Sequence, residues 1–180
     1  MPLIKVSILI FFIMKRVQFI KFFVVFLFCA VFTMGASAQN TFNKGDKVLH
    51  AGIGVGNTFS GYSSMIPIAA SFEVGIKDNL FDDKSSLGVG GYFGFASKDG
   101  WTFLYPGARA ALHYQFVDKL DTYAGLMLGI RSWSGHGWSY TDFIIPFFLG
   151  ARYYFADNIG GFAELGHGIA YLQLGVSIKF

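Results

Sequence analysis

The sequence has a single cysteine and few charged residues. Cys29 stands alone, so neither a disulfide framework nor a cysteine-ligated zinc site can form. Charged residues make up 14% of the 180 residues, whereas aromatic residues make up 19%. This balance excludes an intrinsically disordered chain, because disordered segments are polar and poor in aromatic residues.

The net positive charge of the chain comes from its first 38 residues. They contain Lys5, Lys15, Arg16 and Lys21 and no acidic residue. Of the 14 basic and 11 acidic residues, 10 basic and all 11 acidic ones follow, which gives residues 39–180 a net charge of −1. A basic surface for nucleic acid is therefore not expected.

The same 38 residues have the order of a secretory signal peptide. A basic region at 14–21 precedes an apolar run from Phe22 to Phe32, and Ala36-Ser37-Ala38 follows as a cleavage pattern of small residues. We expect export through the Sec pathway, cleavage after Ala38 and a mature domain of residues 39–180. The alternative, a membrane anchor, is disfavoured because the run is shorter than the ~20 residues of a spanning helix. Residues 1–13 precede the basic region, so translation could start at Met1 or, as is more usual for such signals, at Met14.

After residue 38 no apolar run approaches the length of a transmembrane helix, and apolar residues alternate with polar or small ones. In 172–180, for example, Leu172, Leu174 and Val176 alternate with Gln173 and Gly175. Period-two alternation predicts β-strands. Eight such segments cover residues 47–57, 66–77, 86–97, 103–117, 121–132, 143–155, 159–167 and 170–180.

These segments predict an eight-stranded antiparallel up-and-down transmembrane β-barrel. Each is near the ~9–11 residues that a tilted strand needs to cross a bilayer. One face carries Leu, Ile, Val, Phe and Ala, and the other carries Gly, Ser, Tyr, Gln and a few charges, which suits a polar interior and an apolar band facing lipid. A soluble sandwich is the alternative. We expect Asp78, Asp118 and Asp157 in periplasmic turns. Aromatic residues near the opposite loops are expected to form an interfacial girdle: Tyr62, Trp101, Tyr105, Trp133, Trp138 and Tyr140.

Residues 39–180 resemble the small outer-membrane β-barrel proteins of Gram-negative bacteria, in the OmpA/OmpX/opacity-like group. The segments 150–155 and 162–166 look like the porin-family outer membrane proteins of Bacteroidetes. The final stretch, 172–180, is similar to the C-terminal signature that the barrel-assembly machinery recognises, with Phe180 as its last residue. The resemblance implies a bacterial outer-membrane location, with membrane lipid and that machinery as partners. It implies no particular activity, cofactor or extracellular ligand.

The charges expected to face the lumen are the main candidate site. They are Glu73, Arg109, Arg131, Arg152 and Glu164, all on the polar face of their segments. Because an unpaired buried charge is costly, we expect the three arginines to pair with the two glutamates and close the lumen. This favours a structural or surface-interaction role. The alternative is a narrow passive pore, since the many lumen-facing glycines leave room either for neighbouring side chains or for water.

A lipid-modifying outer-membrane enzyme is a further, less favoured alternative. His136 lies near Ser132, Ser134 and Ser139, with Asp142 as the nearest carboxylate that could orient it. The chain's four histidines lack the i, i+4 spacing of a helical zinc site. We therefore predict no enzyme activity, no catalytic residue, no cofactor and no metal ligand.

Overall fold

The computed structural model describes residues 41–59 and 65–180. The expected signal peptide, its cleavage site and both possible start codons lie outside the described residues, as does Tyr62. Within the two described ranges, no helix is long and apolar enough to cross a membrane.

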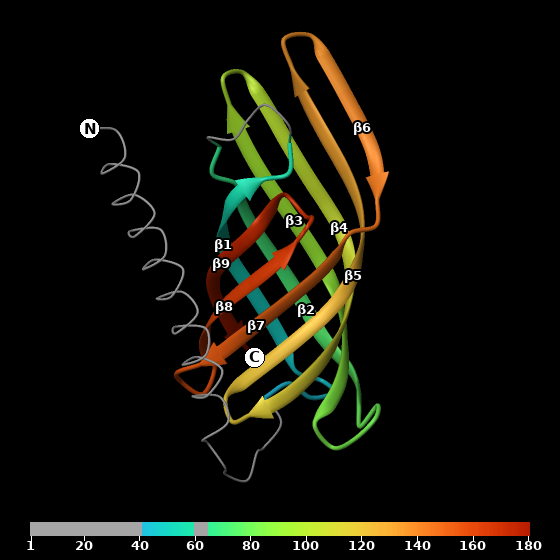
Figure 1. The fold of residues 1–180 in the computed structure, drawn as a ribbon, viewed down its shortest axis with the longest axis vertical. Coiled ribbons are helices and arrows are strands. Elements are labelled where there is room, and N and C mark those ends of the chain that lie inside the picture. Colours follow the sequence, from blue (N-terminus) through green and yellow to red (C-terminus); the bar gives the residue numbers. More distant parts are fainter. Residues whose placement is uncertain (1–40, 60–64) are drawn as a thin grey trace, which may run out of the picture. The chain divides into compact units, whose positions relative to one another are not determined.

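The described residues form an antiparallel sheet that closes on itself (Figure 1). Its strands are β1 (Lys47–Asn57), β2 (Ile68–Asp78), β3 (Ser85–Lys98), β4 (Trp101–Val117), β5 (Leu120–Gly135), β6 (Trp138–Ile144), β7 (Phe147–Tyr154), β8 (Ile159–Gly166) and β9 (Ala170–Lys179). Consecutive strands pair with each other except β6 and β7, which both pair with β5, and β9 pairs with β1. The ring β1-β2-β3-β4-β5-β7-β8-β9 confirms the predicted eight-stranded fold.

Strands β6 and β7 share the predicted segment 143–155, of which only Phe143 and Ile144 belong to β6. They are separated by Ile145 and Pro146, and proline has no N–H to donate to a neighbouring strand. The Pro146 carbonyl still accepts a hydrogen bond from Met127 N at 3.0 Å, which keeps the two strands in line on β5. The ring therefore stays closed at this point, because β7 pairs with both β5 and β8.

Burial alternates along the strands, with apolar side chains on the outside. In β2, Ser71 and Glu73 are buried, whereas Ile68 and Phe72 are exposed. The other strands of the ring repeat this pattern, and their exposed side chains include Leu49, Ile53, Phe93, Leu112, Leu126, Leu128, Leu149, Leu165 and Leu174. The polar residues thus fill the lumen, and the apolar residues form an outer band.

The hairpins differ in length at the two ends of the ring. We call the end where β1 begins and β9 ends the terminal end, and the opposite one the hairpin end. At the hairpin end, the β3–β4 and β5–β6 hairpins extend beyond the β8–β9 hairpin (Figure 1). Their turns, Asp99-Gly100 and His136-Gly137, have positive φ at both residues. This geometry fits the right-handed twist of the strands, so the hairpins can continue as regular sheet.

The expected aromatic girdle at this end is wrong. Phe103 and Tyr105 are 1% and 0% exposed, whereas Leu104 between them faces outward. By the same alternation Trp101, Trp133, Trp138 and Tyr140 lie on the side of their strands that faces the barrel axis. Nearness to a loop suggested the girdle, but strand parity decides which way a side chain points.

We expect the folded mature chain to migrate faster in SDS gels before boiling than after it. A closed ring has no free edge at which SDS can begin to separate strands, so it resists the detergent until heated. Electrophoresis with and without boiling measures this shift. Identical mobility in both lanes, with the protein in the soluble fraction after cell disruption, would contradict the barrel and indicate a soluble sandwich.

Candidate functional site

Arg152 is the centre of the charged lumen. Its side chain is fully buried, with Nε 2.6 Å from Asp121 Oδ2 and Nη1 3.3 Å from Glu73 Oε2. Nη1 also lies 3.0 Å from His50 Nε2, which must accept because a guanidinium has only donors. His50 is therefore neutral at this nitrogen.

His113 lies between the two carboxylates that contact Arg152. Its Nε2 is 3.1 Å from Glu73 Oε1, and its Nδ1 is 3.0 Å from Asp121 Oδ2. A carboxylate only accepts hydrogen bonds, so both ring nitrogens carry protons and the ring is an imidazolium. This charge, together with those of Arg109 and Arg152, balances the three buried carboxylates of the lumen.

A second ion pair lies toward the hairpin end. Arg109 contacts Glu164 through both guanidinium nitrogens, Nη2 to Oε2 at 2.8 Å and Nη1 to Oε1 at 3.4 Å. The Arg109 Cζ atom lies 4.0 Å from the centre of the Phe148 ring, a cation–π contact. Arg109 and Arg152 are thus held by different acids.

The structure places Glu73, Arg109, Arg152 and Glu164 together in the lumen but puts Arg131 elsewhere. Arg131 donates from Nε and Nη2 to Asp142, at 3.0 and 2.5 Å. The prediction that Arg131 pairs with a lumen glutamate is wrong because Asp142 is its direct cross-strand neighbour on β6.

The Arg131–Asp142 pair also differs from the lumen pairs in its surroundings. Its outward neighbours Ser132 and Thr141 are polar, so it lies beyond the outer apolar band. The hydrogen bonds from Arg131 lower the pKa of Asp142. The pair therefore stabilises the fold above the usual carboxyl pKa of about 3.9, and this contribution is lost as the pH falls through the lowered value.

Sequence reasoning missed Asp121 and His50 as members of the network. Asp121 has the parity of the buried Tyr123, but it is the first residue of its predicted strand, next to the expected periplasmic turn at Asp118. His50 alternates with Gly52 and Gly54, which were expected in the lumen. Strand parity was the available signal in both cases.

The lumen glycines make room for side chains from neighbouring strands. A Cβ on Gly150 would lie 2.4 Å from the Tyr123 ring, and one on Gly125 would lie 2.6 Å from Phe148 Cζ. A Cβ on Gly88 would meet the Glu73 carboxylate at 2.8 Å. At these positions the space left by glycine is occupied by protein atoms.

Residues 41–46 fold back across the terminal end of the lumen. Phe42 is only 3% exposed, and its ring centre lies 4.2 Å from that of His113 and 4.6 Å from Arg152 Cζ. Thr41 N donates to Gln115 Oε1 at 2.5 Å, and the Phe42 carbonyl accepts from Ser86 Oγ at 2.9 Å. This segment, which we call the N-terminal cap, covers the charged network.

Apolar side chains close the hairpin end of the lumen. Phe59 packs on Phe103 with ring centres 4.3 Å apart, and Ile169 is completely buried beside Tyr92. The Tyr92 hydroxyl accepts a hydrogen bond from Gln173 Nε2 at 2.7 Å, which ties the β8–β9 hairpin into the barrel. The charged layer thus lies between the N-terminal cap and an aromatic closure.

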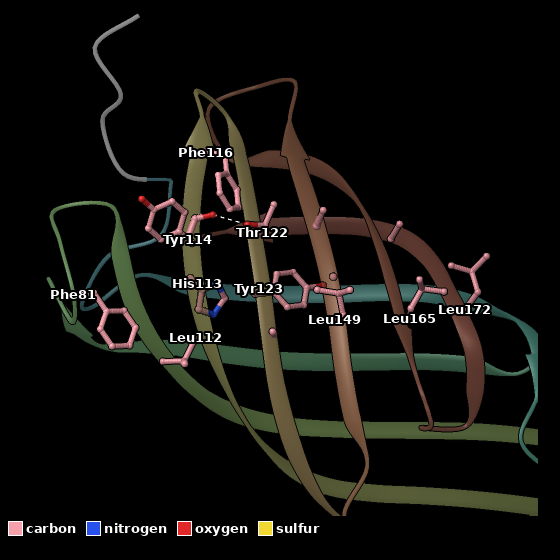
Figure 2. Close-up of a pocket in the computed structure, with 14 residues that line it drawn as sticks. Phe81, Leu112, His113, Tyr114, Phe116, Thr122, Tyr123, Leu149, Leu165 and Leu172 are labelled. Carbon is pink, nitrogen blue, oxygen red and sulfur yellow. Dashed lines mark hydrogen bonds between the residues drawn. The ribbon is translucent and has the colours of Figure 1, made fainter. Parts of the chain in front are cut away.

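A hollow of about 710 Å³ lies at the wall formed by β4, β5, β7, β8 and β9. Figure 2 shows Leu112, Leu149, Leu165 and Leu172 following one another across these strands. These leucines have the outward parity of the apolar band. The hollow is therefore a depression in the outer apolar surface of the barrel, and we assign no catalytic role to it.

The residues considered for catalysis do not form a Ser–His–Asp arrangement. His136 Nε2 lies 3.0 Å from the Asp99 carbonyl oxygen, and Asp142 is bound to Arg131. The Ser132 hydroxyl accepts a hydrogen bond from Thr141. Among the described residues, no group of His, Cys, Asp and Glu could hold a metal ion.

No protein-family model matches the sequence, and no curated protein matches it either. Among solved structures, a designed transmembrane β-barrel is 17% identical, with a TM-score of 0.50 over 80% of this chain and 100% of that one. The N-terminal β-barrel domain of Pseudomonas aeruginosa OprF is 14% identical, with a TM-score of 0.50 over 77% and 98%. The attachment invasion locus protein Ail of Yersinia pestis is 14% identical, with a TM-score of 0.46 over 76% and 99%.

The two matches at a TM-score of 0.50 share the closed antiparallel ring. The fold is a transmembrane β-barrel. In this barrel the buried ion pairs face the lumen and the apolar side chains face the surroundings, as the predicted fold class requires.

We expect Glu164→Gln to destabilise the barrel far more than Asp142→Asn. Both changes turn a carboxylate that binds an arginine into its amide, but Glu164 is buried and Asp142 is partly exposed. Breaking a buried pair typically costs about 3–5 kcal/mol, and breaking a surface pair about 0.2–1 kcal/mol. Urea unfolding in lipid vesicles measures both. Equal unfolding midpoints for the two variants would contradict the claim that the buried Arg109–Glu164 pair stabilises the barrel more than the Arg131–Asp142 pair.

Phe42→Ala tests the N-terminal cap. Removing a buried Phe typically costs about 3–5 kcal/mol, and here it also exposes His113 and Arg152 to water. Phe155→Ala is the matched control, because Phe155 follows β7 at the same end and is exposed. We expect a lower unfolding midpoint for Phe42→Ala alone. A midpoint unchanged from the parent chain would mean that the cap does not hold the lumen closed.

Proposed function

We propose that this protein is an integral outer-membrane β-barrel with a structural or surface-interaction role and a closed lumen. The observation that carries this proposal is that three layers fill the lumen one after another: the N-terminal cap, the charge-balanced network and the aromatic closure. The cap contributes the buried side chains of Thr41 and Phe42, and the other two layers are made of buried side chains from several strands and their connecting segments. A solute entering from either end meets packed protein atoms.

The proposed location and assembly rest on features at the two ends of the sequence. We assign residues 1–38 to Sec-dependent export, which leaves the N-terminal cap as almost the first part of the mature chain. Phe180 is exposed at the end of β9, and its backbone N–H donates to the Lys47 carbonyl at 2.8 Å. Its side chain is thus free to serve as the signal for the barrel-assembly machinery while its backbone closes the ring.

The resemblance to the OmpA/OmpX/opacity-like group and to porin-family proteins of Bacteroidetes supports this assignment. In such an arrangement the terminal end faces the periplasm and the hairpin end faces the outside. Membrane lipid then surrounds the apolar band. The proposal includes no turnover, since Asp142, the carboxylate that would orient His136, is bound to Arg131.

Bilayer conductance tests the closed lumen against the passive pore. We expect no current steps from the purified barrel in 1 M KCl, because ions would have to cross a buried, balanced ion network and an aromatic closure. A water-filled porin in the same bilayer is the positive control. Reproducible discrete steps from the parent barrel would identify it as a pore and reject the closed lumen.

A further inference from the structure

The polarity of the two strand faces reverses along the β5–β6 hairpin. Outward residues of β5 are apolar up to Ile130 and then become Ser132 and Ser134. On β6 they change from Phe143 to Thr141 and Ser139. A polar outward face does not belong in hydrocarbon, so the lipid-facing band ends at this level and the rest of the hairpin projects beyond it.

The axis-facing side of the projecting sheet is aromatic. Trp101 comes from β4, Trp133 from β5, and Trp138 and Tyr140 from β6. Trp133 and Tyr140 pack with ring centres 4.4 Å apart, while Trp101 packs against His136 in the β5–β6 turn. We call these four side chains the aromatic face. Since it points away from lipid, it is not a membrane anchor.

Part of the aromatic face is open. Phe59 reaches the edge of Trp133, at 5.9 Å between ring centres, and covers that side. Trp138 and Tyr140 remain 77% and 53% exposed. Exposed apolar patches that are rimmed by polar residues mark interaction sites and ligand-binding grooves.

A charged pair lies beside the open rings. Arg131 and Asp142 are bound to each other, and their side chains are 20% and 23% exposed. Together they carry no net charge, yet they offer N–H donors and carboxylate acceptors in a fixed arrangement. A ligand that suits this site is uncharged, has both hydrogen-bond donors and acceptors, and has an apolar face that can lie against the rings of Trp138 and Tyr140.

We propose that the aromatic face binds a neutral sugar chain on the outer side of the membrane. The electron-rich face of an aromatic ring attracts the weakly positive C–H groups of a pyranose, and the hydroxyls at the sugar's edge can reach Arg131 and Asp142. Tyr140 and Trp138 are two residues apart on one strand, about 7 Å, so a short oligosaccharide can contact both. The inference rests on the proposed function, in which this end faces outward.

The size of the aromatic face favours a small ligand over a folded protein. A standard protein interface uses roughly 20–30 residues on each side, far more than the few axis-facing side chains of this hairpin. A second candidate is an extended peptide, because β6 pairs only with β5 among the described residues and its other edge is free. The peptide would bind by backbone hydrogen bonds and would not need the open rings.

Intrinsic fluorescence reports this surface selectively, because all three tryptophans of the chain belong to the aromatic face. The full barrel is refolded in a detergent without a sugar headgroup and titrated with cellotetraose, maltotetraose and mannotetraose. We expect at least one to change the tryptophan emission saturably, with a Kd on the order of 1 mM. Tyr140→Ala and Asp142→Asn keep all three tryptophans and should weaken that binding at least about fivefold.

Thr141→Ala is the matched control, because Thr141 lies on β6 between these residues and faces the other way. It should bind as the parent does. No saturable change with any of the three sugars overturns the proposal, as does binding that Tyr140→Ala leaves intact. A change produced only by a strand-forming peptide of alternating Thr and Val identifies the β6 edge instead. The heat shift and the absence of conductance are measured on the same samples, so a failed sugar site is distinguishable from a failed barrel.

Discussion

The structure depends on neutralising Arg152 inside the barrel. A fully buried guanidinium is tolerable only if acids surround it, and Glu73 and Asp121 do so from β2 and β5. Two acids around one arginine leave a negative charge, which the His113 imidazolium between them removes. The four side chains come from four strands, so the network forms only when the ring is closed and in register.

Side-chain size follows from the same constraint. An eight-stranded ring encloses a space just wide enough for its own side chains, so large inward residues must face small ones. Tyr123 lies over Gly150, and Phe148 lies against Gly125. The charged network and these aromatic residues therefore compete for one volume, and glycine at the facing positions lets both fit.

The unequal hairpins separate two surfaces of different polarity. Within the apolar band the barrel is polar inside and apolar outside, whereas the projecting β5–β6 hairpin is polar outside and aromatic toward the axis. The change occurs between Ile130 and Ser132, where the surrounding medium changes. One continuous strand can carry both arrangements. Its side chains alternate between two faces along its whole length, and each face can be polar at one level and apolar at another.

The sequence by itself determined the strand alternation, the ring of eight strands and the inward position of Glu73, Arg109, Arg152 and Glu164, since a period of two assigns every residue to a face. Only the tertiary structure decided the partners. Arg131 pairs with Asp142 rather than with a lumen glutamate, because the pairing of β5 with β6 places those two residues opposite each other. Asp121 and Phe42 join the lumen because strand closure and the returning N-terminal segment bring them there. Parity is a local property of a strand, whereas pairing depends on register across the ring, which alternation leaves undetermined.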